Sequence, residues 1–202
     1  MSVAEAPVIQ ASVADGEAML ALLRNRRSIG KVSDVAPGRE LIWQMLEAAT
    51  WAPNHHLTEP WRFFVLEGDA RAELGQVMGA VAARREQDPD TKIRAAESAA
   101  KKPLRAPYVI GVGVEPTADS PWIEEVAAGA AAVQNMLLAA EALGLGAVWR
   151  SGWIAFEPEI REHFGLSERG QMLGFVYVGL PLARPGGRER RPVTEVTTWN
   201  HD

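Results

Sequence analysis

The sequence of 202 residues contains no cysteine. This absence excludes disulfides, thiolate metal sites and cysteine nucleophiles, and it is consistent with a reducing compartment. We therefore expect a cytoplasmic protein. Histidine is also scarce, with four residues, and the neighbouring His55 and His56 point apart on any regular backbone. A histidine-rich metal site is therefore not predicted.

Basic residues are fewer than acidic ones, 21 against 26, which gives a formal net charge of −5. Nucleic-acid binding needs a basic surface that displaces counterions, so we expect no nucleic-acid partner. The longest uncharged run, residues 126–140, is too short to span a bilayer, and no membrane partner is expected. The first fifteen residues carry no Lys or Arg, unlike a signal or transit peptide.

Several familiar catalytic signatures are missing as well. The sequence has no Walker loop and no G-x-S-x-G nucleophile elbow. Gly144-Leu145-Gly146 follows a predicted helix instead of a strand, so it is not a dinucleotide fingerprint. No pair of carboxylates stands out for acid–base chemistry. The sequence therefore predicts no catalytic side chain of these kinds.

The length and composition, with 47% hydrophobic and 23% charged residues, indicate one globular domain. Hydrophobic periodicity and turn residues predict both helices and strands. Predicted helices lie near residues 19–25, 39–51, 69–84, 91–101, 122–143 and 158–165, with Asp69 as an N-cap. Predicted strands lie at residues 61–66, 108–114, 147–149 and 171–180. Helices and strands mix without a βαβ rhythm, so the predicted class is α+β.

Three segments follow from this pattern: an N-terminal arm (residues 1–14), one domain (residues 15–182) and a C-terminal extension (residues 183–202). Residues 193–199 have strand-like character, and a late strand could pair with a partner subunit. Gly129 in the long helix is expected to let another helix approach, so that this helix forms a buried spine. The charged segment 84–102 is typical of a lid or peripheral cover.

Residues suited to binding an anion and a ring lie at the ends of three predicted elements. They are Arg26-Arg27-Ser28, His55 within the loop 51–61, and Trp149-Arg150-Ser151-Gly152. Arginine forks suit a phosphate dianion, and backbone N–H groups can face a ring nitrogen. One phosphate and one flat redox-active ring would use all three groups. Plainer interpretations stay open: the arginines cap a helix, and the tryptophans of the loop are core residues.

Together these motifs resemble the nitroreductase family of FMN flavoproteins. The matching segments, in order, are Asn25–Ser28, Ala52-Pro53 through Pro60–Val65, Gly144–Gly152 and Gly174–Gly179. The match is closest to the small bacterial subgroup with a Trp-Arg-Ser-Gly loop and covers about residues 15–182. It implies a nitroreductase-like α+β fold, with a central, mostly antiparallel sheet flanked by helices. It also implies an intertwined homodimer with two FMN sites at the subunit interface.

The same resemblance implies which residues bind cofactors. Arg26, Arg27 and Ser28 would hold the flavin phosphate, ribityl chain and pyrimidine edge. Trp51 and His55 would approach the flavin from the other subunit. Trp149, Arg150 and Ser151 would line the ring, with the Ser151–Gly152 backbone near flavin N5. The end of the long helix would border the nicotinamide cofactor, through Ala139, Ala140, Glu141, Ala142, Leu143 and Gly144.

The function implied by the resemblance is an FMN-dependent oxidoreductase. NADH or NADPH would deliver a hydride to flavin N5. A small organic acceptor such as a nitroaromatic or quinone would then bind in the same place and be reduced by the flavin. No side-chain acid or base is required, in agreement with the absence of such a motif. Two alternatives remain: a flavin-binding carrier or sensor without turnover, and a flavin-free structural dimer in which Arg26 and Arg27 only cap a helix.

The sequence departs from the family pattern at four positions. Leu57 stands where most relatives have asparagine, and Glu59 where they have glutamine. Trp51 replaces a basic residue of the subgroup, and it can stack on a ring but cannot neutralise a phosphate. Gly30 stands where many relatives have a lysine or arginine, and Lys31 is one residue further on.

Overall fold

The computed structural model describes residues 12–117, 120–187 and 189–200. In these ranges the α-helices are α1 (Val13–Asn25), α2 (Arg39–Thr50), α3 (Asp69–Arg84), α4 (Pro89–Ala100), α5 (Trp122–Ala142) and α6 (Pro158–His163). The strands are β1 (Trp61–Leu66), β2 (Tyr108–Val114), β3 (Gly146–Arg150) and β4 (Gln171–Gly179). Short 3-10 helices are η1 (His55–Leu57), η2 (Pro103–Arg105), η3 (Trp153–Phe156) and η4 (Val193–Val196).

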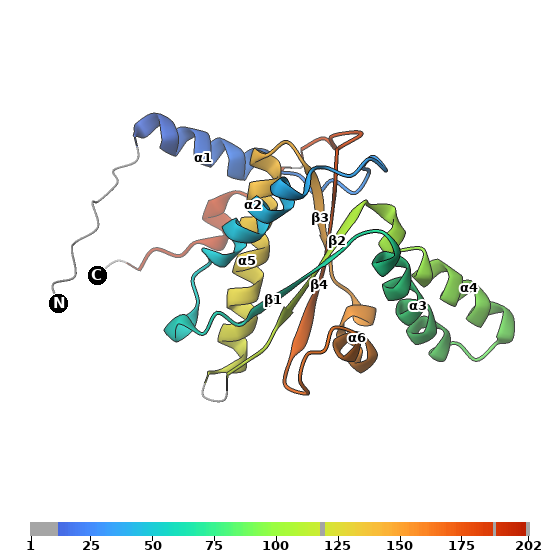
Figure 1. Ribbon diagram of the computed structural model, residues 1–202. Helices are drawn as coiled ribbons and strands as arrows, with labels where there is room; N and C mark the ends of the chain where they lie inside the picture. The colour runs from blue at the N-terminus through green and yellow to red at the C-terminus, as the bar shows by residue number, and fades with distance from the viewer. Residues whose placement is uncertain (1–11, 118–119, 188, 201–202) are drawn as a thin grey trace.

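The four strands form one sheet in the order β1-β2-β4-β3, and every neighbouring pair is antiparallel. Helices cover both faces of this sheet, as Figure 1 shows, with α2 and α5 on one side and α3 and α4 on the other. The α+β class and the antiparallel sheet flanked by helices are therefore confirmed.

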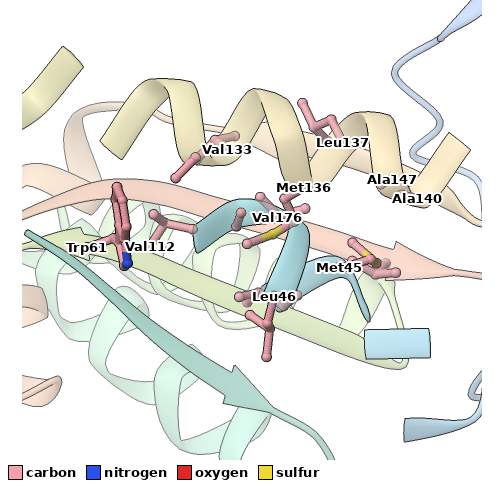
Figure 2. Packing of buried hydrophobic residues seen from close by; sticks show 14 of the residues in the cluster. Met45, Leu46, Trp61, Val112, Val133, Met136, Leu137, Ala140, Ala147 and Val176 are labelled. Atoms are coloured by element: carbon pink, nitrogen blue, oxygen red, sulfur yellow. The ribbon is translucent and has the colours of Figure 1, made fainter. Parts of the chain in front are cut away.

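Period-two alternation in β2 divides its side chains between two cores. Ile110 and Val112 face α2 and α5, whereas Val109 faces α3 and α6. On the first side, Met45 of α2 and Met136 of α5 are fully buried against the sheet. Figure 2 shows these side chains meeting between the two helices and the strands. This packing fixes the sheet as the frame on which the loops at its ends are held.

Gly129 of α5 serves the sheet instead of a second helix, so the expectation of a close helix–helix approach is wrong. A Cβ atom on Gly129 would lie 2.5 Å from Leu173 Cδ1 and 2.6 Å from Val114 Cγ1. Both atoms belong to strands, so the missing side chain lets α5 settle onto the sheet. Helix α5 does form the expected buried spine of the domain, with nine buried residues along its length.

Two predicted details at the chain surface differ in the structure. Asp69 is the first residue of α3, and Gly68, with φ of 53°, occupies the cap position instead. The strand-like segment 193–199 contains a 3-10 helix at Val193–Val196, begun by Pro192. Every described residue from Leu180 to Asn200 is exposed in this chain. β-Branched residues favour strands because they pack against neighbouring strands. Within the described residues, no strand lies beside this exposed segment.

The N-terminal arm lies largely outside the described residues, and α1 already begins at Val13. Ser12 and Asp15 form a capping box, in which each side chain bonds to the other residue's backbone N–H. Helix α1 buries none of its residues in the chain.

Gly75 is the point of closest approach between α3 and α4. A Cβ atom there would collide with the carbonyl oxygen of Ala100, a backbone atom that cannot swing aside. We expect Gly75→Ala to lower the free energy of unfolding by about 1–3 kcal/mol, because the two helices must separate.

The matched control is Gly16→Ala, a helix-interior glycine of α1 with nothing within 4 Å of the new Cβ atom. This substitution should raise the free energy of unfolding by about 0.5–1 kcal/mol through helix propensity alone. Urea denaturation measures both values. Equal effects of the two substitutions would contradict the close packing of α3 on α4.

Candidate functional site

A bulge in β4 shapes the end of the sheet where the site lies. Val112 pairs with Gly174, but Gly113 pairs with Met172, so Leu173 is an extra residue on β4. The extra residue reverses the alternation, and Phe175 and Tyr177 therefore face the α3 side of the sheet.

Gly174 at this bulge also admits the neighbouring strand. Its φ of 134° lies in a region that side chains disfavour. A Cβ atom there would lie 2.6 Å from the carbonyl oxygen of Arg150 and 2.8 Å from Trp149 Nε1. In this space the indole N–H of Trp149 donates to the carbonyl of Leu173 at 3.3 Å. The bulge thus fixes the predicted Trp-Arg-Ser-Gly segment at the end of β3.

A pocket of about 420 Å³ opens beside this segment. It contains Trp149, Arg150, Ser151 and Gly152, so the structure brings these predicted residues together. Its further lining residues are Met78, Lys102, Arg105, Trp153, Ile154, Ala155, Phe175 and Tyr177. The pocket combines several aromatic rings with three cationic side chains, and none of its lining residues is acidic.

Tyr177 lines the pocket, and the Arg150 guanidinium carbon lies 5.7 Å from its ring centre. Burial raises the pKa of the Tyr177 phenol above its ordinary value, although Arg150 and Arg105 oppose the shift. The phenol is therefore protonated near neutral pH, and its O–H remains available as a donor.

The Arg26-Arg27-Ser28 segment follows α1 and leads along the edge of the sheet. The Ile29 N–H donates to the carbonyl of Ala147 in β3 at 2.8 Å. At the next residue, a Cβ atom on Gly30 would lie 2.9 Å from Arg150 Nη2. The segment therefore passes beside Arg150, although none of its residues lines the pocket.

Arg26 and Arg27 differ in how their guanidinium groups are used. Arg27 Nη1 donates to the carbonyls of Arg24 and Arg26, at 2.8 and 2.9 Å, so Arg27 caps the end of α1. Arg26 Nη1 is buried and has no hydrogen-bond partner in the part of the chain described. A buried, unpaired guanidinium nitrogen is costly, and an anion beside it would supply the missing acceptor.

Trp51 and His55 lie away from the pocket. Trp51 is the residue after α2 and is 81% exposed, and His55 begins η1, which packs on α5. His55 Nδ1 lies 3.0 Å from Glu124 Oε2 on that helix. Since α2 and α5 cover the face of the sheet opposite the pocket, one chain does not bring these two residues to the pocket.

The loop after α2 has an unusual backbone. His56, Leu57 and Glu59 have φ values of 48°, 55° and 44°, which are strained for residues with side chains. The loop is held at both ends, because the Glu59 N–H donates to Asn54 Oδ1 at 3.0 Å and the Thr58 hydroxyl donates to the buried Glu125 at 2.9 Å. Backbone strain of this kind concentrates at ligand-binding segments.

The predicted nicotinamide segment, Ala139–Gly144, also lies outside the pocket. Ala140 is 1% exposed and belongs to the core beneath α5. Glu141 forms an ion pair with Arg184, which also donates to the carbonyl of Asn25 at 2.7 Å. Ala142 and Gly144 are exposed and remain accessible to a ligand.

The role of Gly174 at the bulge was not predicted from the sequence. Eight lining residues of the pocket were not predicted either, namely Met78, Lys102, Arg105, Trp153, Ile154, Ala155, Phe175 and Tyr177. Lys102 and Arg105 lie on either side of Pro103, in a basic segment that carries no recognisable motif. Glycine inside a predicted strand is a signal for a bulge, and this signal was present at Gly174.

The fold and pocket define an α+β protein with an antiparallel sheet and a cationic, aromatic site at one end. A family model described as the Nitroreductase family matches residues 23–180. The chain belongs to the nitroreductase family.

Individual relatives agree with this assignment. An Escherichia coli K12 protein with the provisional name NAD(P)H nitroreductase YdjA is 39% identical over 167 residues, covering 80% of this chain and 87% of that protein. A nitroreductase-like family protein from Bacillus cereus has a TM-score of 0.81 and 27% identity, covering 98% of this chain and 100% of that chain. A provisionally named nitroreductase from Desulfovibrio desulfuricans, solved with FMN, has a TM-score of 0.67 and 30% identity, covering 91% and 97%.

The described residues lack two further kinds of site. No helix among them has the length and apolar character needed to cross a membrane. In the same ranges, no group of three or more His, Asp or Glu side chains is arranged to hold a metal ion.

The role assigned to Gly174 can be tested by Gly174→Ala. The new methyl group would meet the backbone of Arg150, so we expect the free energy of unfolding to fall by about 1–3 kcal/mol. Gly152→Ala is the control, because Gly152 also has positive φ (151°) but nothing within 4 Å of an added Cβ atom. Urea denaturation of both variants separates the collision from backbone strain. An equal loss in both would contradict the close approach of β3 to the bulge.

Proposed function

We propose that this protein is an FMN-dependent oxidoreductase that uses NADH or NADPH to reduce a small organic acceptor such as a nitroaromatic or quinone. The observation that carries the proposal is the pocket at Trp149–Gly152, together with the unpaired Nη1 of Arg26 on the segment that reaches Arg150 at Gly30. The family, the NAD(P)H nitroreductase name of the relative from E. coli, and the FMN of the D. desulfuricans structure support it.

The residues present fit FMN. The buried Arg26 Nη1 lacks an acceptor, which a phosphate oxygen would provide, and Ser28, two residues further on, is exposed. Arg27 would contribute charge, since its Nη1 is occupied by backbone carbonyls. Trp149, Arg150 and Ser151 would hold the ring. The chemistry that FMN supplies when bound is two-electron transfer between NADH or NADPH and an organic acceptor.

The protein's part in this chemistry is to bind and orient. Trp149 is held by its bond to the Leu173 carbonyl, so its ring offers a fixed surface. Ser151 and Gly152 are exposed at the rim of the pocket, where their backbone can contact a ligand. Arg150 places a positive charge beside Tyr177. No side-chain acid or base is needed for hydride transfer.

The proposal includes a homodimer in which Trp51 and His55 reach the partner's flavin. Two observations support it. Helix α1 buries no residue in its own chain, although Met19, Leu20 and Leu23 are 48%, 50% and 44% exposed. The C-terminal extension, residues 183–202, is also exposed where described and would exchange with the partner. Exposed apolar surface of this extent is typical of an interface.

The rest of the proposal follows the same arrangement. Residues 15–182 would form the FMN-binding domain. The end of α5, through Ala139, Ala140, Glu141, Ala142, Leu143 and Gly144, would border the nicotinamide cofactor. The cysteine-free sequence supports a cytoplasmic location.

Arg26→Ala tests the phosphate contact. Charge-assisted hydrogen bonds contribute about 1.5–3 kcal/mol, so we expect FMN affinity to fall about 10- to 150-fold. Riboflavin, which lacks the phosphate, should bind the variant and the unchanged protein equally. Fluorescence titration of the apoprotein with each flavin measures both affinities.

The control is Arg24→Ala, which removes an exposed arginine from the last turn of the same helix. It should leave FMN affinity unchanged. If Arg26→Ala also leaves FMN affinity unchanged, or lowers riboflavin affinity by the same factor as FMN affinity, Arg26 does not bind the phosphate.

A further inference from the structure

The loop between α2 and β1 is held by two consecutive carboxylates of α5. Glu125 is fully buried, and its Oε2 accepts a hydrogen bond from the Thr58 hydroxyl at 2.9 Å. Glu124 Oε2 lies 3.0 Å from His55 Nδ1. Figure 1 shows this loop beside α5, toward the beginning of the helix. One turn of one helix therefore contacts the loop at two points, and one of these points is His55.

Both carboxylates lie where negative charge is favoured. They belong to the first turn of α5, whose backbone N–H groups and helix dipole attract anions, and Pro121 before the helix supplies no side-chain cap. Even so, Glu125 Oε1 has no hydrogen-bond partner within the described residues. A buried carboxylate is costly when it lacks donors, so losing the Thr58 hydroxyl would leave Glu125 largely unsatisfied.

The loop needs this hold because its backbone is strained. Three of its residues have positive φ, between 44° and 55°, namely His56, Leu57 and Glu59. Residues with side chains disfavour this region, so the loop would relax unless its surroundings fixed it. The sheet fixes it only from Pro60 onward, whose carbonyl accepts the Glu115 N–H at 2.8 Å. Thr58 lies among the strained residues, so its bond to Glu125 holds them in place.

Glu124 lies where it favours one tautomer of His55. Glu124 Oε2 is buried, and a proton on His55 Nδ1 would give it the hydrogen bond that it otherwise lacks in the described ranges. A neutral imidazole with its proton on Nδ1 presents Nε2 as an acceptor. The His56 ring lies edge-on to the His55 ring, with centres 3.9 Å apart, and restricts its rotation.

We propose that Glu124 and Glu125 are positioning residues for His55. Glu125 holds the strained loop through Thr58, and Glu124 fixes the imidazole with its proton on Nδ1. The inference rests on the proposed function, in which His55 approaches the partner's flavin. It adds a role for Nε2, which would accept a hydrogen bond from an N–H or O–H group of FMN. Both carboxylates act through His55 and do not contact the flavin themselves.

Fluorescence titration of the apoprotein with FMN tests the hold on the loop. Thr58→Val keeps the shape of the side chain but removes the hydroxyl, so we expect FMN affinity to fall about tenfold. Thr58→Ser keeps the hydroxyl and should keep the affinity within about twofold. Thr91→Val is the matched control, because the Thr91 hydroxyl also makes one bond of 2.9 Å, to the carbonyl of Asp88 before α4. It should leave FMN affinity unchanged.

The same titration in a His55→Ala background decides whether the effect passes through the imidazole. His55→Ala alone should lose at least as much FMN affinity as Thr58→Val. Residues that act through one another have non-additive effects, so adding Thr58→Val to His55→Ala should change the affinity by less than about twofold. A tenfold loss in both backgrounds would make the loop contact merely structural and overturn the proposal. An unchanged affinity in Thr58→Val alone would overturn it as well.

The tautomer of His55 gives a readout that needs neither flavin nor turnover. At a pH where histidine is neutral, the ring ¹⁵N NMR spectrum should place the His55 proton on Nδ1, and His55→Ala identifies the signals. In Glu124→Ala this single assignment should be lost. A proton on Nε2 in the unchanged protein, or a spectrum that Glu124→Ala does not alter, would contradict the role of Glu124.

The two proposals can fail separately. A protein that binds no FMN and oxidises neither NADH nor NADPH defeats the proposed function. The NMR spectra of that same protein still decide whether Glu124 fixes His55.

Discussion

The bulge at Gly174 is the constraint on which the site depends. One extra residue in β4 turns Phe175 and Tyr177 toward the α3 side, and the missing side chain lets β3 approach. The indole of Trp149 then bonds to the Leu173 carbonyl, and Arg150 comes to lie beside Tyr177. On the other face, α5 packs closely on the sheet at Gly129, against Leu173 and Val114.

Most of the fold could be predicted from the sequence, because hydrophobic periodicity reports which residues are buried. The strands Trp61–Leu66 and Tyr108–Val114 have their predicted ends, and the helices lie where apolar spacing indicates. Hydrophobic periodicity does not reveal which element lies beside a glycine. Gly129 was therefore predicted to contact a helix, whereas it faces the sheet. Propensity also failed at residues 193–199, whose β-branched side chains have no sheet beside them in the described residues.

The candidate site could be predicted only where motifs carry it. Trp149–Gly152 lie together in the pocket, and Arg26, on the segment that contacts β3 at Ile29, has a buried, unpaired Nη1. Lys102 and Arg105 could not be found, because their importance comes from α3 and β3 converging on their loop. Trp51 and His55 lie across the sheet from the pocket, so their proposed contact with a flavin depends on a second chain and stays a prediction.

The absorption spectrum of the purified protein, recorded before and after anaerobic addition of NADH or NADPH, tests the central claim most directly. The account predicts visible flavin bands, restored by FMN if the cofactor is lost, and their bleaching by one of the two donors. A protein that remains colourless after FMN is added would contradict the account. Flavin bands that neither donor bleaches would leave a carrier or sensor, and would contradict the proposed oxidoreductase.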